Sequence, residues 1–164
     1  VAQLSVEVNM SLASLANVSP RGVLNRRGLR RRAEQYARDL AIRAPSLQAR
    51  IATLSGGNQQ KVQIAKWLAA KPNVLVIESP THGVDVGAKL EIHRLLLEFA
   101  AAGGAVIVAS TDIPETVSIA DRVAVFSRGD LVEIVGAAET SHRQVLLSGT
   151  RAPELDEIEA LIAT

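Results

Sequence analysis

The second half of the chain alternates short apolar runs with an amphipathic segment. Val74–Ile77 and Ala105–Ser110 are continuous apolar runs rich in β-branched residues, a pattern that predicts parallel strands buried on both faces. Between them, apolar residues recur at the spacing of one helical face and predict a helix over residues 86–101, with the stripe Ile92, Leu95, Leu96 and Phe99. This strand–helix–strand order indicates an α/β fold with a mainly parallel sheet.

The rest of the chain contains further elements of both kinds. "DIPETVSIAD" predicts a short helix with proline in its first turn, and "RVAVF" and "LVEIVG" predict a hairpin that turns at "SRGD". Pro153–Ile162 has the pattern of an acidic amphipathic helix. In the first half, we expect helices over Leu29–Ile42 and Gly57–Ala70, the second with the apolar face Val62, Ala65, Leu68 and Ala69.

These elements suggest three segments. We expect residues 1–71 to form a helical subdomain, residues 72–150 to form the C-terminal part of a sheet core, and residues 151–164 to form an acidic helical tail. Composition excludes several classes of site. The chain has no cysteine, and its three histidines lack metal-ligand spacing. No apolar run approaches the roughly 18 residues of a membrane span, and no signal peptide is evident at the N-terminus.

Charge is distributed unevenly along the chain. Residues 1–71 carry twelve Lys/Arg against three acids, whereas residues 72–164 carry six against fourteen. Nine arginines fall between residues 21 and 50. Such a block is typical of proteins that bind nucleic acid or an anionic membrane surface, but it is equally typical of a solvated helical face or a subunit contact. Only Tyr36 could stack on a base here, so we expect no nucleic-acid partner.

Ser55-Gly56-Gly57 stands directly before a predicted helix and is a candidate anion site. Two adjacent glycines allow close backbone approach to a ligand, and a helix N-terminus offers unpaired N–H groups with a positive dipole end. The hydroxyl of Ser55 adds a donor, which suits the group to a terminal phosphate. An ordinary serine N-cap with a glycine turn would explain the same three residues.

"LSGGNQQK" (Leu54–Lys61), followed by an aliphatic run and "ESPTHGVDVGAK", resembles the nucleotide-binding domains of ABC transporters, in particular those of sugar importers. "LSVEVNMSL" (Leu4–Leu12) and Ser110–Gly129 resemble further segments of that family. The resemblance implies an incomplete P-loop NTPase (ABC ATPase) fold, with a helical subdomain followed by part of the sheet core. It also implies that the signature residues bind nucleotide held by an opposite domain; these are Ser55, Gly56, Gly57, Asn58 and Gln59.

The resemblance assigns roles to four other positions. Glu78 stands where the family has a magnesium-side aspartate, and Ser79 stands where it has the glutamate that activates water. Thr111 occupies the switch position, where many relatives have histidine. Asp85 falls in the loop that communicates with the opposite domain, and it is also a suitable N-cap for the helix that follows. Because serine is no base at neutral pH, we expect this chain's own half-site to hydrolyse ATP weakly.

The chain lacks G-x-x-x-x-G-K-[ST], the phosphate loop that a self-sufficient P-loop ATPase requires, and it contains no Gly-Lys pair. We therefore expect the back part of a nucleotide-binding domain that is not active alone and would aggregate or need a partner when isolated. The implied cofactors are ATP and Mg²⁺, shared with a partner domain. The implied partners are a second nucleotide-binding domain, membrane permease subunits and, indirectly, a periplasmic sugar-binding protein.

The function implied by the resemblance is energy coupling in a carbohydrate ABC importer, at the cytoplasmic face of the membrane as a peripheral subunit. The family hydrolyses ATP, but the altered residues leave open whether this chain does. Two alternatives are a non-catalytic dimerisation or regulatory remnant of such a domain and an ABC-type ATPase of DNA maintenance. The string "GVDVGAK" favours the sugar importer over the DNA-maintenance class.

Overall fold

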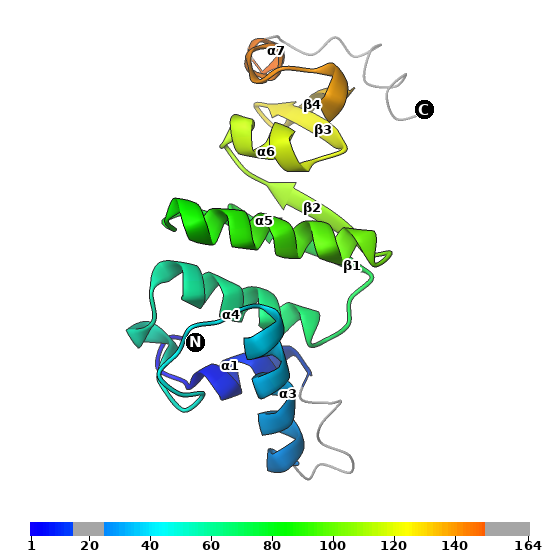
Figure 1. Cartoon of the computed structure of the whole chain (residues 1–164). Coiled ribbons are helices and arrows are strands. Elements are labelled where there is room, and N and C mark those ends of the chain that lie inside the picture. The colour runs from blue at the N-terminus through cyan, green and yellow to red at the C-terminus, as the bar shows by residue number, and fades with distance from the viewer. Residues whose placement is uncertain (15–24, 150–164) are drawn as a thin grey trace. The chain divides into compact units, whose positions relative to one another are not determined.

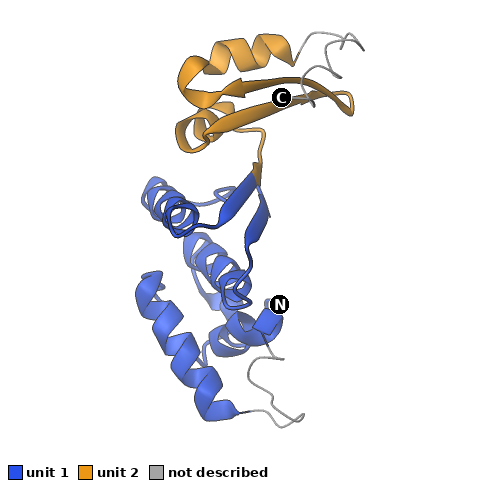
Figure 2. Cartoon of the chain, turned by 90° about the vertical axis from the view of Figure 1, so that its right-hand side faces the viewer, with its two compact units in different colours: residues 1–107 blue, residues 108–164 orange. Residues whose placement is uncertain are grey.

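In a computed structural model the chain divides into two compact units, residues 1–107 and residues 108–164 (Figure 2). The structure describes residues 1–14 and 25–149, and each unit is considered by itself. The predicted segments, which end at residues 71 and 150, were defined by the type of element and not by compactness, so they stay a prediction. The predicted acidic helix over Pro153–Ile162 lies outside the described residues.

The first unit begins with three packed helices (Figure 1). They are α1 (Val6–Ser11), α3 (Arg26–Asp39) and α4 (Gly56–Leu68), with short 3₁₀ turns at Leu12–Ser14 and Ile51–Thr53. The predicted helix over Leu29–Ile42 is confirmed but begins earlier, because the Asn25 side chain accepts a hydrogen bond from the Gly28 N–H and caps the first turn. It ends at Asp39, and Ala41 has a positive φ of 47°.

The core of this unit joins the three helices to α5 (Val86–Ala101). The predicted apolar face of α4 is confirmed, since Val62, Ala65 and Ala69 are buried and Leu68 packs against the cluster. On α5 the stripe Ile92, Leu95 and Leu96 is buried. The cluster of buried residues consists of Val6, Met10, Ala33, Leu40, Ile42, Ile51, Leu54, Val62, Ala65 and Leu95.

Two strands flank α5 in the chain and pair with each other, β1 (Val74–Glu78) and β2 (Ala105–Ala109). The prediction that both strands are buried on both faces is wrong. Leu75 is buried, but the neighbouring Val76 is 68% exposed, and Ile107 on β2 is 56% exposed. The physical reason is that α5 lies on one side of this sheet (Figure 2), and within the described residues of the first unit no other element covers the opposite side.

The second unit is a hairpin with two short helices. Its elements are α6 (Ile113–Ile119), β3 (Arg122–Ser127), β4 (Asp130–Gly136), a 3₁₀ turn at Ala137–Glu139, and α7 (His142–Ser148). The predicted hairpin is confirmed: β3 and β4 are antiparallel, and Arg128 and Gly129 turn the chain with φ of 53° and 100°. Val123, Val125, Ala137 and Val145 form its core.

Asp85 caps α5 as predicted, because its side chain accepts a hydrogen bond from the Ala88 N–H at 2.9 Å. The helix then runs over the predicted span.

Among the described residues, no helix is both long enough and apolar enough to cross a bilayer.

Candidate functional site

Ser55 stands at the N-cap of α4 without capping it. Its backbone is extended, and its side chain makes no hydrogen bond to the first-turn amides. Instead, its Oγ accepts a hydrogen bond from Asn58 Nδ2 at 2.9 Å. Ser55 and Gly56 are both exposed. The ordinary serine cap therefore does not describe this turn, and the first-turn N–H groups stay available to an external anion.

The two amide side chains of the motif hold the turn in place. Asn58 Oδ1 accepts a hydrogen bond from the backbone N–H of Arg43 at 2.7 Å, while its Nδ2 holds the Ser55 hydroxyl. Gln59 Nε2 donates to the carbonyl of Leu54 at 2.8 Å. Asn58 thus links the turn to the loop that contains Arg43. The hydrogen bonds of both side chains described here are made to other groups of the chain.

The adjacent glycines allow α4 to approach the segment that precedes α5. A Cβ on Gly57 would lie 2.4 Å from the Cβ of Ala88, and a Cβ on Gly56 would lie 3.0 Å from the carbonyl oxygen of Gly83. Real Cβ atoms do not come as close as the first of these distances. The sequence suggested that glycine here serves a ligand, and the structure adds that it serves packing between α4 and α5.

An ion pair also joins α4 to α5, and sequence reasoning missed it. Lys61 is 2% exposed, and its Nζ donates to the carbonyl of Ala41 at 3.0 Å and to the Glu91 carboxylate. The hydrogen bond and charge of Lys61 hold the pKa of Glu91 below its usual range. The available signal was a lysine four residues after Gly57, on the same buried helical face.

These contacts surround a pocket of about 210 Å³ that brings together four predicted site residues, Ser55, Gly57, Asn58 and Asp85. Arg43, Lys61, Gly87, Ala88 and Glu91 complete its lining. The charged side chains are two cations and two carboxylates, so their formal charges cancel. Attraction for an anion therefore rests on the exposed Ser55 turn and its amides rather than on an excess of positive charge.

Glu78 and Ser79 are not among the residues that line this pocket. Glu78 ends β1 with an exposed side chain, and Ser79 follows with a φ of 43°, in the left-handed region. The Ser79 carbonyl accepts a hydrogen bond from the His82 N–H at 3.1 Å and closes a tight turn. Thr111 belongs to the second unit, where it is exposed just before α6.

The residues around Glu78 do not make a complete metal centre. Within the described residues, no three His, Cys, Asp or Glu side chains gather in a way that could hold an ion. Magnesium typically takes one or two carboxylates and fills its octahedron with water and phosphate oxygens. One exposed carboxylate fits Mg²⁺ in that limited sense, as a single contact to a nucleotide-bound ion.

Comparisons with known proteins identify the fold and the family. Residues 3–82 match the family described as ABC transporter. One relative is a protein of Pseudomonas syringae pv. syringae (strain B728a). Its name provisionally assigns it as an ATP-binding protein for import of ribose, galactose and methyl galactoside. It is 43% identical over 143 residues, which are 87% of this chain and 27% of the relative. A ribose import ATP-binding protein of Streptomyces coelicolor is 41% identical over 150 residues, covering 92% of this chain and 30% of its own length.

The chain thus spans less than a third of these relatives. A dimeric ATP-binding cassette solved in a post-hydrolysis state with ADP and Pi superposes with a TM-score of 0.71 at 25% identity, covering 84% of this chain and 58% of the other. That likeness confirms the expected P-loop NTPase fold of the ABC ATPase type, present in part. The family match, the sequence relatives and the shared fold together show that this chain belongs to the ABC transporter ATP-binding family.

Proposed function

We propose that the chain is part of the ATP-binding, energy-coupling component of a carbohydrate ABC importer. The single observation that carries this proposal is the Ser55 turn: an intact signature motif, exposed, with first-turn amides that no side chain caps. The sugar class comes from relatives named for import of ribose or of ribose and galactosides. The residues of the Ser55 turn would contact ATP and not the sugar, so they do not select which sugar is imported.

In this proposal the Ser55 turn completes an ATP site built on another nucleotide-binding domain. The amides of the first turn of α4 point along the helix axis and carry roughly half a positive charge, which suits them to the terminal phosphate. The Ser55 hydroxyl donates to the same group, and Asn58 keeps that hydroxyl in position. Gly56 and Gly57 keep the turn close to residues 83–88. A movement of the turn on binding phosphate would therefore also move Asp85.

The chain's own catalytic side is weaker in this proposal. Ser79 replaces the family's water-activating glutamate, and a positioned general base is worth about 10²–10⁴ in rate. Glu78 would contact nucleotide-bound Mg²⁺ through water. Thr111 would sit at the switch position. The chain therefore helps a partner domain to hydrolyse ATP more than it hydrolyses ATP itself.

The proposed partners follow from the function. They are a second nucleotide-binding domain, membrane permease subunits and, through the permease, a periplasmic sugar-binding protein. The chain would work as a peripheral subunit at the cytoplasmic face of the membrane, with ATP and Mg²⁺ as cofactors.

Replacing Ser55 by arginine in the full-length protein tests the proposal. A large cation at this exposed turn would fill the space for the phosphate and remove the hydroxyl, so hydrolysis should fall by about 10², the usual cost of losing an oxyanion donor. Ser46→Arg is a matched control, because Ser46 is also exposed and lies outside the pocket lining. Equal steady-state ATP hydrolysis in Ser55→Arg and wild type would contradict the proposal.

A further inference from the structure

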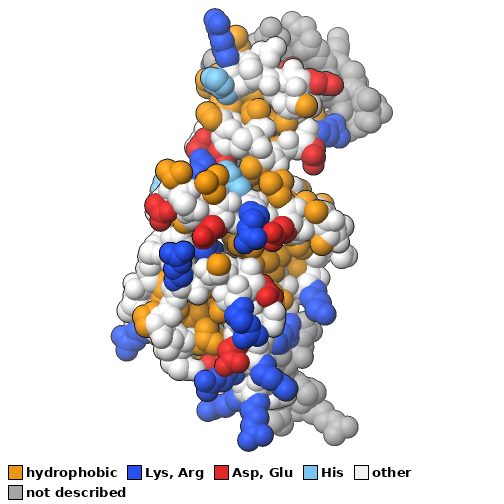
Figure 3. All heavy atoms as spheres, in the orientation of Figure 1, with side chains coloured by type: hydrophobic (Ala, Val, Ile, Leu, Met, Phe, Trp, Pro, Cys, Tyr) orange, Lys and Arg blue, Asp and Glu red, His pale blue; other side chains and the backbone are white. Residues whose placement is uncertain are grey.

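The arginine-rich helix α3 has no role in the nucleotide chemistry proposed above. Its fourteen residues carry six arginines and two acids, which gives the helix a formal charge of +4. Figure 3 shows Lys and Arg side chains gathered over this helix. Its apolar side is occupied, since Leu29 and Ala33 are buried. The helix is therefore a fixed part of the first unit that presents a basic face to its surroundings.

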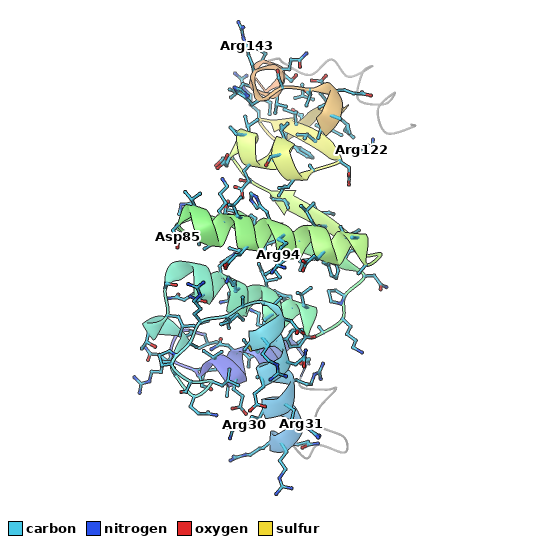
Figure 4. The ribbon with its side chains drawn as sticks, viewed as in Figure 1. Arg30, Arg31, Asp85, Arg94, Arg122 and Arg143 are labelled. Atoms are coloured by element: carbon cyan, nitrogen blue, oxygen red, sulfur yellow. The ribbon has the colours of Figure 1, made fainter. Side chains whose placement is uncertain are left out.

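The outward arginines follow one stripe. Arg27, Arg31 and Arg38 are all exposed, and their spacing of four and seven residues places them on one side of a helix. The stripe spans about 16 Å at 1.5 Å per residue. Arg26 and Arg30 are exposed beside it, and Figure 4 labels Arg30 and Arg31 where they project from α3.

Only part of this charge is engaged by other groups of the chain. In α3 the acid Glu34 pairs with Arg30, Arg38 bonds to Gln35, and Arg32 donates to the carbonyl of Ala69. Within the described part of the chain, Arg26, Arg27 and Arg31 make no ion pair.

The position of two of these arginines works against the helix itself. Arg26 and Arg27 stand in the first turn, where no acid is present and where the helix dipole disfavours cations. These two cations therefore gain nothing from the helix dipole and are free to meet an anion outside the chain.

We propose that the face of α3 formed by Arg26, Arg27, Arg30, Arg31 and Arg38 binds anionic phospholipid headgroups at the membrane surface. The choice of lipid as the anion rests on the proposed function, which places the chain beside a membrane. Clusters of four to eight basic residues on a helix are a recognised mode of anionic-lipid binding. Because the apolar side of α3 is used in the core, contact is electrostatic, without insertion of the helix into the bilayer.

Nucleic acid is the other common partner of such a surface, and the structure gives it less support. Single strands are held largely by stacking on aromatic side chains. Tyr36, the one tyrosine, is partly buried, and its hydroxyl donates to the carbonyl of Leu68 at 3.3 Å. The face therefore offers charge without an exposed aromatic side chain on which a base could stack.

Co-sedimentation of the full chain with vesicles tests the proposal without nucleotide, sugar or permease. The chain should bind vesicles of phosphatidylcholine with about one-third phosphatidylglycerol at low salt, and binding should be lost near 1 M salt, where the Debye length falls to about 3 Å. Pure phosphatidylcholine vesicles should bind much less. Since each surface arginine contributes about 1 kcal/mol, Arg27→Gln with Arg31→Gln should weaken binding about 30-fold.

The matched control is Arg122→Gln with Arg143→Gln, which removes the same charge from two exposed arginines on β3 and α7 (Figure 4). This control should bind as wild type does. Circular dichroism and urea unfolding of both double variants confirm that the exposed substitutions leave the fold intact. Equal loss in the two double variants would overturn the proposal, as would equal binding to uncharged vesicles. Tighter binding to duplex or single-stranded nucleic acid than to anionic vesicles at the same salt would also overturn it. Because the assay needs no ATP, its failure leaves the hydrolysis tests unaffected.

Discussion

At the scale of single residues, Gly57 and Ala88 decide how near the Ser55 turn comes to α5. A Cβ at residue 57 would lie 2.4 Å from the Ala88 Cβ, and both Cβ atoms would be attached directly to helical backbone, so neither could move away by rotating. Gly57→Ala should therefore lower the free energy of unfolding by about 1–3 kcal/mol, despite the better helix propensity of alanine. Adding Ala88→Gly should restore packing and recover part of that loss. Urea unfolding of both variants measures this, and a Gly57→Ala variant as stable as wild type would contradict the packing role.

Lys61 and Glu91 predict a pH dependence of stability. Lys61 lowers the folded-state pKa of Glu91 below its ordinary value, so this pair stabilises the fold at pH values above that ordinary pKa. The stabilisation is lost as pH falls through the lower folded pKa. Between about pH 5.5 and pH 3, wild type should lose more stability than Lys61→Met, measured by urea unfolding.

The matched control for this pair is Glu98→Gln. It breaks the exposed Arg94–Glu98 pair on the same helix and should keep the wild-type slope between the two pH values. If Lys61→Met has the same slope as wild type, the pair does not contribute in this way.

At the scale of elements, α5 is stabilised by the N-cap residue that precedes it. The Asp85 carboxylate accepts the Ala88 N–H, so Asp85→Ala should destabilise the chain by about 0.5–2 kcal/mol. Asp85→Asn keeps the cap and removes the charge, and it should stay near wild type in thermal unfolding. If both variants lose the same stability, the charge rather than the cap is responsible.

Helices α3, α4, α5 and α6 were predictable from sequence, whereas α1, α7 and the burial of the sheet were not. Asp85, the apolar stripe of α5 and the glycines after it are local signals, and they predict the approximate bounds of that helix. The runs around Val76 and Ile107 predict strands, but periodicity cannot report which faces other elements cover. The result is an exposed sheet face where burial was expected.

The candidate site was predictable in part for the same reason. The motif identified Ser55, Gly57, Asn58 and Asp85 as related residues, and the structure places them around one pocket. It could not identify Glu91, thirty residues from Lys61, because the pair depends on how α4 packs against α5. Nor could it show that the two glycines face residues of the chain itself.

At the scale of the whole molecule, two surfaces of one chain have unequal roles in the proposed function. The Ser55 turn keeps a complete signature motif, while the end of β1 has serine where the family has its catalytic glutamate. The predicted low solubility of the isolated chain stays a prediction, consistent with the exposed apolar residues Val74 and Val76. In the proposed function, the two surfaces would serve different ATP molecules of one assembly.

Single-turnover hydrolysis by the full-length protein tests this central claim most directly. With ATP bound at both sites, wild type should show one fast phase and one phase slower by about 10²–10⁴, because the Ser79 side lacks a general base. Ser79→Glu should convert the slow phase into a second fast one, whereas Ser55→Arg should remove the fast phase. Two equally fast phases in wild type, or no effect of either substitution, would contradict the account.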